Sequence, residues 1–169
     1  MKTLVIAAAA IATALAATPA AAQAVSANPR ATASARLIKP LTLSALQNLN
    51  FGTIVMGTLT GSSSVSMASD GVLTCGANLT CAASGQPGQF RITGTQGQVV
   101  LVSSSAASFP LVGSNGGTLA FVPSLPTPIT LGNSGAPGNS FNIGGSIAIA
   151  VTQQDGVYSG QIDVQVAYQ

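Results

Sequence analysis

The sequence predicts an all-β protein built as a sandwich or barrel of antiparallel strands. After the first residues helical periodicity is almost absent, glycine and proline interrupt the chain about every eight to twelve residues, and the stretches between them alternate apolar and polar residues. A period of two places every second side chain on one face, as in a half-buried strand. Turn signals at this spacing are typical of antiparallel sandwiches and barrels.

The N-terminus predicts export. Lys2 supplies a positive charge, a short apolar run follows, and Ala22-Gln23-Ala24 fits the small-x-small pattern of a cleavage site. The apolar run is too short to cross a bilayer. We therefore expect residues 1–24 to be a signal peptide that is cleaved between Gln23 and Val25. The product would have no integral membrane segment and would lie in the periplasm, on the cell surface or outside the cell.

The remaining chain carries very little charge. Without Lys2, four of the five Lys and Arg residues face three Asp residues, and there is no Glu and no His. So few cations cannot neutralise many phosphates, so nucleic acid is not an expected partner. Metal sites need clustered His, Cys, Asp or Glu, and acid–base or nucleophilic catalysis needs paired ionisable groups. We expect no metal, no cofactor and no enzymatic activity.

The two cysteines, Cys75 and Cys81, are expected to form a disulfide, because an exported chain meets an oxidising compartment. Their spacing does not fit the C-x-x-C motif of redox enzymes. Closing so short a loop stabilises the fold by roughly 2 kcal/mol in the chain-entropy estimate.

The clearest expected strand is the last one. Five of its residues share one parity and would form its buried face: Tyr158, Ile162, Val164, Val166 and Tyr168. A second alternating run, 146–152, precedes it, and Asp155-Gly156 lies between the two. Asp-Gly is a typical type I′ turn, so these runs are predicted to form a hairpin. Shorter strands are expected at 49–55, 64–67, 90–93, 99–102 and 119–122, with a short edge strand at 129–131 in a proline-rich loop.

The segment after the signal peptide alternates over residues 25–37, which as a strand would extend about 43 Å, beyond the usual strand length. Its apolar parity includes Val25, Ala27, Ala31, Ala33 and Ala35. The segment is either a loose tail or an arm that pairs with something else. We therefore divide the mature chain into an N-terminal arm, residues 25–36, and a β-sandwich domain, residues 37–169.

The order of several short motifs resembles a bacterial exported family known as domain of unknown function 4402. The motifs that carry the resemblance are Ala33-x-Ala35, Pro40-Leu41-Thr42-Leu43, Leu49-x-Phe51-Gly52, Phe90-x-Ile92-Thr93-Gly94, Gly156-x-Tyr158-Ser159-Gly160 and Val164-x-Val166-x-Tyr168. The match covers nearly all of the mature chain, and the Cys75–Cys81 loop is not part of it.

The same layout is similar to spore-coat-U and chaperone–usher pilin subunits. That resemblance implies an immunoglobulin-like sandwich that lacks one strand, which a neighbour's N-terminal arm supplies. It also implies that Ile162, Val164, Val166 and Tyr168 lie beside the gap, and that partners are the protein itself, related subunits or a periplasmic chaperone. The arm is mostly alanine, so each of its side chains would contribute less than the 1.5–3 kcal/mol of a buried Val or Leu.

Two functions remain open from the sequence. The first is a secreted or cell-surface structural subunit, similar to those of fimbriae, that assembles by donor-strand addition. The alternative is a monomeric periplasmic or extracellular β-sandwich that serves as a binding or adhesion module. A surface of low charge that is rich in Ser, Thr, Asn and Gln fits both.

Overall fold

The computed structural model describes residues 30–82, 84–126 and 128–169. The expected signal peptide and the first part of the arm lie outside the described residues. Within those ranges the chain forms strands and no helix, and every strand pairing is antiparallel. The predicted all-β class is confirmed. Residues Leu37–Gln169 form one compact unit.

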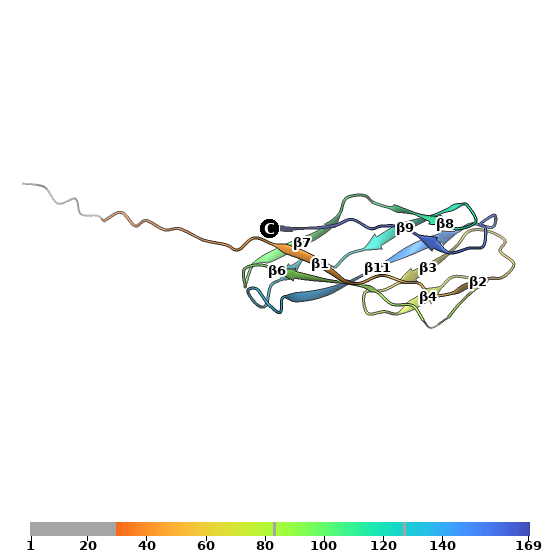
Figure 1. Cartoon of the computed structure of the whole chain (residues 1–169), viewed down its shortest axis with the longest axis horizontal. Coiled ribbons are helices and arrows are strands. Elements are labelled where there is room, and N and C mark those ends of the chain that lie inside the picture. Colours follow the sequence, from red (N-terminus) through yellow and green to blue (C-terminus); the bar gives the residue numbers. More distant parts are fainter. Residues whose placement is uncertain (1–29, 83, 127) are drawn as a thin grey trace, which may run out of the picture. The chain divides into compact units, whose positions relative to one another are not determined.

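The strands follow one another closely along the chain (Figure 1). Their bounds are β1 (Thr42–Gln47), β2 (Ile54–Met56), β3 (Ser63–Met67), β4 (Leu73–Cys75), β5 (Leu79–Cys81), β6 (Gly88–Thr93), β7 (Val99–Ser104), β8 (Phe109–Gly113), β9 (Thr118–Ser124), β10 (Ile129–Thr130), β11 (Asn139–Ile149), β12 (Tyr158–Ser159) and β13 (Val164–Tyr168).

The strands form three sheets. The largest follows the order β1-β6-β11-β9-β8-β12, and β3 and β4 join it through β11. Figure 1 shows β3, β11, β9 and β8 side by side. A three-stranded sheet has the order β10-β7-β13, and β2 pairs with β5 in a two-stranded sheet.

Strand β11 connects the parts of the large sheet, because its two halves have different partners. Residues 139–143 pair with β6, whereas residues from Gly144 onward pair with β9 and residues from Gly145 onward pair with β3. A Cβ atom at Gly144 would overlap the carbonyl oxygen of Met67, and one at Gly145 would overlap the ring of Phe121. Two glycines therefore allow three strands to meet at this point.

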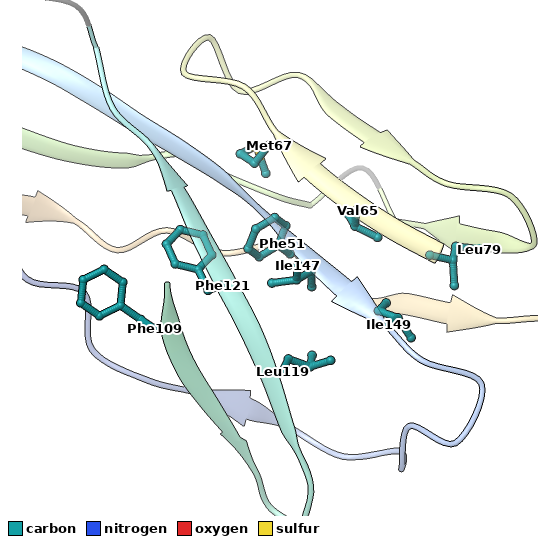
Figure 2. Close-up of a cluster of buried hydrophobic side chains, with 9 residues drawn as sticks. All are labelled: Phe51, Val65, Met67, Leu79, Phe109, Leu119, Phe121, Ile147 and Ile149. Atoms are coloured by element: carbon teal, nitrogen blue, oxygen red, sulfur yellow. The ribbon is translucent and has the colours of Figure 1, made fainter. Parts of the chain in front are cut away.

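The buried side chains form two clusters. The first, drawn in Figure 2, consists of Phe51, Val65, Met67, Leu79, Phe109, Leu119, Phe121, Ile147 and Ile149. The second consists of Ile92, Val100, Leu131, Phe141 and Ile143, and the half-buried side chains of Val164, Val166 and Tyr168 pack against it. Because the second cluster contains residues of β6, β7 and β11, and side chains of β13 pack against it, it joins the large sheet to the three-stranded sheet.

The predicted hairpin at Asp155-Gly156 is wrong. Both edges of the second half of β11 are already paired, with β3 and with β9, so no edge is left for the strand that follows. Strand β12 pairs with β8 instead, and β13 pairs with β7. A type I′ turn needs a positive φ at both central residues, whereas Asn78 is the only non-glycine residue with a positive φ among the described residues.

The long final strand is also divided. Residues 160–163 belong to no strand, because β12 pairs with one strand of the large sheet and β13 pairs with a strand of the smaller one. The strands predicted at 64–67, 90–93, 99–102 and 119–122 are confirmed, and the short edge strand at 129–131 corresponds to β10. Of the strand predicted at 49–55, only the end is present, as β2, preceded by a single bridge between Asn50 and Gln86.

Candidate functional site

A groove of about 1150 Å³ opens between two segments that are far apart in the sequence. One wall is formed by residues of the segment 45–56, which contains the end of β1 and all of β2, and the other by residues 153–163, which contain β12. Its floor consists of apolar side chains from β6, β8, β9 and β11: Phe90, Leu111, Leu119, Phe121, Ile143 and Ile147. Figure 2 shows Phe121 and Ile147 of this floor beside Phe51 of the first wall.

Each wall of the groove includes one end of the large sheet. Strands β1 and β12 are the first and last strands in its order, and each has one neighbour, β6 or β8. Among the described residues, the other edge of each strand is therefore unpaired. An unpaired edge carries backbone N–H and C=O groups that can accept a further strand.

Strand β1 has an inward-facing position that no other side chain covers where the groove begins. Leu41 and Leu43 pack against the second cluster, and Ala45 continues their parity along β1. Ala45 is nevertheless exposed and lines the groove. The inward face of β1 thus changes from packed to open where the groove begins.

The rim of the groove is polar and nearly uncharged. Its amide side chains are Gln47, Asn48, Asn50, Gln153, Gln154 and Gln161. Two exposed carboxylates, Asp155 and Asp163, also lie on it. An apolar floor with amide groups and free strand edges around it suits an extended peptide whose side chains alternate between apolar and polar.

The structure divides the predicted face of the last strand between two places. Tyr158 and Ile162 line the groove and pack against the first cluster. Val164, Val166 and Tyr168 pack against the second cluster instead. All five side chains are half-buried. In Tyr158 the hydroxyl donates to the carbonyl oxygen of Gln154, at 2.6 Å, and accepts from Nε2 of Gln153, also at 2.6 Å.

The hydroxyl of Tyr168 anchors the segment that precedes β1 by hydrogen bonds. It donates to the carbonyl oxygen of Lys39 at 2.7 Å and accepts from the backbone N–H of Thr95 at 2.9 Å. The N–H of Lys39 donates to Oγ1 of Thr95 at 2.6 Å. A Cβ atom at Gly94 would lie too close to the Tyr168 hydroxyl, so a larger residue there would displace the hydroxyl or its neighbours. The sequence gives one signal for this anchor, a tyrosine rather than a phenylalanine on an apolar face.

Replacing Tyr168 by Phe is expected to lower the free energy of unfolding by about 1 kcal/mol, because the N–H of Thr95 loses its acceptor. Urea denaturation measures this change, and amide exchange at Thr95 should accelerate. Val166→Ala, a substitution on the same face that removes no hydrogen bond, serves as the control and should leave exchange at Thr95 slow. Unchanged exchange in Tyr168→Phe would contradict the anchor.

The described part of the arm, residues 30–36, belongs to no strand, and Ala31, Ala33 and Ala35 are exposed. Val25 and Ala27 lie outside the described residues. Cys75 and Cys81 form a disulfide that joins the end of β4 to the end of β5. Asn78, in the short loop between these strands, has a left-handed backbone with φ of 60°.

In the described ranges, no three His, Cys, Asp or Glu side chains lie close enough together to hold a metal ion. The described residues also contain no helix of the length and apolarity that a membrane span requires.

Residues 41–168 match the sequence profile of a family described as Domain of unknown function (DUF4402). No curated protein and no solved structure matches the chain.

Proposed function

The chain belongs to the DUF4402 family, and we propose that it is an exported structural subunit that assembles by adding a strand from another polypeptide. In this proposal the domain is an immunoglobulin-like, pilin-like β-sandwich whose gap is the groove between β1 and β12. The observation that carries the proposal is the groove itself, an apolar floor between two unpaired strand edges. The protein acts through assembly and not through catalysis.

The incoming strand is the N-terminal arm of a second copy or of a related subunit. Its apolar parity, which includes Ala31, Ala33 and Ala35, faces the floor, and its polar parity faces solvent. The floor residues Phe121, Ile143 and Ile147 are at most 4% exposed, so little apolar surface remains for large side chains to cover. Small side chains fit this floor, and backbone hydrogen bonds to the free edges supply most of the binding.

A helper protein is part of the same proposal. Free strand edges beside the groove would recruit wrong partners at high concentration. A periplasmic chaperone that covers the groove until assembly would prevent this. The signal peptide delivers the chain to the periplasm, from which assembled subunits reach the cell surface.

A bulky side chain in the groove tests the proposal. Ala45→Trp places an indole at an exposed position in the groove, whereas Ala120→Trp places the same side chain at an exposed position of β9 that does not line it. Under this proposal the assembled wild-type subunits run as high-mass species on an unheated gel. We expect Ala45→Trp to abolish these species and Ala120→Trp to retain them, and the two variants to have similar melting temperatures. Equal assembly by the two variants would contradict the proposal.

The second candidate, a monomeric binding module, is favoured by the amide-rich rim. Neutral amides around an apolar floor also suit an uncharged ligand such as a glycan. This function predicts that the full chain stays monomeric at high concentration, even with a chaperone supplied, and that Gln153→Ala and Gln161→Ala reduce ligand retention on a glycan array.

A further inference from the structure

We infer that the Cys75–Cys81 disulfide holds one wall of the groove in place, so that its reduction loosens this wall and impairs assembly. The effect on assembly rests on the proposed function, whereas the effect on the wall rests on geometry alone.

The wall formed by β2 depends on a single neighbouring strand. Ile54 and Met56 of β2 line the groove. Among the described strands β2 pairs only with β5, through Ile54 with Cys81, Val55 with Thr80 and Met56 with Leu79. Two further backbone hydrogen bonds of 2.8 Å extend this ladder, from Ala82 to Thr53 and from Gly57 to Asn78. Apart from the packing of Ile54 against the first cluster, the position of β2 is therefore set by the position of β5.

Strand β5 has no strand partner in the large sheet, although two hydrogen bonds tie the loop before it to β3, from the N–H of Gly76 to the carbonyl oxygen of Ser64 and from Oγ of Ser63 to the carbonyl oxygen of Ala77. It has three residues, and β2 is its only partner in the sheet. The buried side chain of Leu79 packs in the first cluster, and the disulfide joins Cys81 to Cys75 at the end of β4. Cys75 pairs with Val65 of β3, which belongs to the large sheet. The disulfide is thus the covalent connection, apart from the chain itself, between the two-stranded sheet and the large sheet.

A reductant can reach this disulfide. Cys75 and Cys81 are half-buried and line a cavity of about 330 Å³ together with Gly71, Leu73, Ala82 and Gly85. A thiolate of a dithiol attacks one sulfur, which breaks the S–S bond and gives a mixed disulfide; the second thiol of the reagent then displaces the protein sulfur. The two cysteines of the protein become free thiols. The dithiol, which supplies two electrons and two protons, becomes a cyclic disulfide.

Reduction should loosen β2 and β5 without unfolding the domain. A two-stranded ladder of three-residue strands is marginal on its own. The constraint that a disulfide adds to so short a loop corresponds to a change of about tenfold or more in a local opening equilibrium. The floor of the groove, on β9 and β11, does not depend on this connection.

Amide exchange and assembly of the full chain test the inference together. Reduction with a dithiol, or the double substitution Cys75→Ser and Cys81→Ser, should accelerate exchange at residues 54–56 and 79–81 about tenfold or more, while β6, β7 and β11 remain protected. The share of high-mass species on an unheated gel should fall in parallel. Adding the dithiol to the double variant is the control, which should change nothing.

Three results would overturn the inference: unchanged exchange in β2 and β5, loss of protection throughout the domain, or faster exchange in this wall with undiminished assembly. If the oxidised wild-type chain forms no high-mass species, the proposed function fails, and the exchange pattern alone then decides whether the disulfide holds the wall.

Discussion

Deleting residues 26–35 is expected to abolish the high-mass species while leaving the melting temperature of the domain unchanged within about 2 °C. The described residues of this segment are exposed and belong to no strand, and the compact unit Leu37–Gln169 begins after it, so every described strand is retained. The deletion also leaves the proposed cleavage site intact. Unheated gels measure assembly, and a thermal scan by circular dichroism measures stability.

Substitutions within the arm separate strand addition from a simple need for length. Asp at Ala31 and Ala33 would place charges against the apolar floor, and assembly should be lost. Asp at Thr32 and Ser34, which have the opposite parity, would face solvent, and assembly should persist. An equal loss in both variants would contradict the alternating contact.

Truncating Phe121 is expected to give the largest loss of stability, about 3–5 kcal/mol for Phe121→Ala. This side chain is 1% exposed and contacts Phe51 edge to face, with ring centroids 6.0 Å apart. It lies in the floor of the groove, where β9 meets β11. Its removal leaves a cavity that the surrounding glycine-rich backbone cannot close without breaking strand pairs.

The neighbouring residue provides a control for this substitution. Val122 follows in the same strand on the opposite face and is 48% exposed. Val122→Ala should lower the free energy of unfolding by less than about 1 kcal/mol. Urea denaturation compares the two, and a similar loss in both variants would mean that the two faces of β9 are assigned wrongly.

Much of the fold could be predicted because alternation is a local property. The strand at 64–67 and the edge strand near 129–131 follow from short patterns between turn residues. Strand pairing could not be predicted in the same way. The Asp155-Gly156 signal favoured a local hairpin, but β3 and β9, which are remote in the sequence, already occupy both edges of β11.

The candidate site was predictable only in part for the same reason. Tyr158 and Ile162 were assigned to an apolar face by their parity, and the structure places them at the groove. The floor depends on β8, β9 and β11 coming together, which no local pattern reveals. The free edges of β1 and β12 are visible only once every strand has been given its neighbours.

Covalent cross-linking between two different copies tests the central claim most directly. One copy carries Ala33→Cys in its arm and Ala45→Trp in its groove; the other lacks residues 26–35 and carries Asn48→Cys on the groove wall. A short bis-maleimide should join the two into a heterodimer. In the control, the first copy keeps Ala33 and carries Arg91→Cys instead, at an exposed residue of β6 outside the groove lining, and the product should be abolished. Failure to cross-link while both proteins remain folded and monomeric would contradict the claim that the groove receives the arm of another copy.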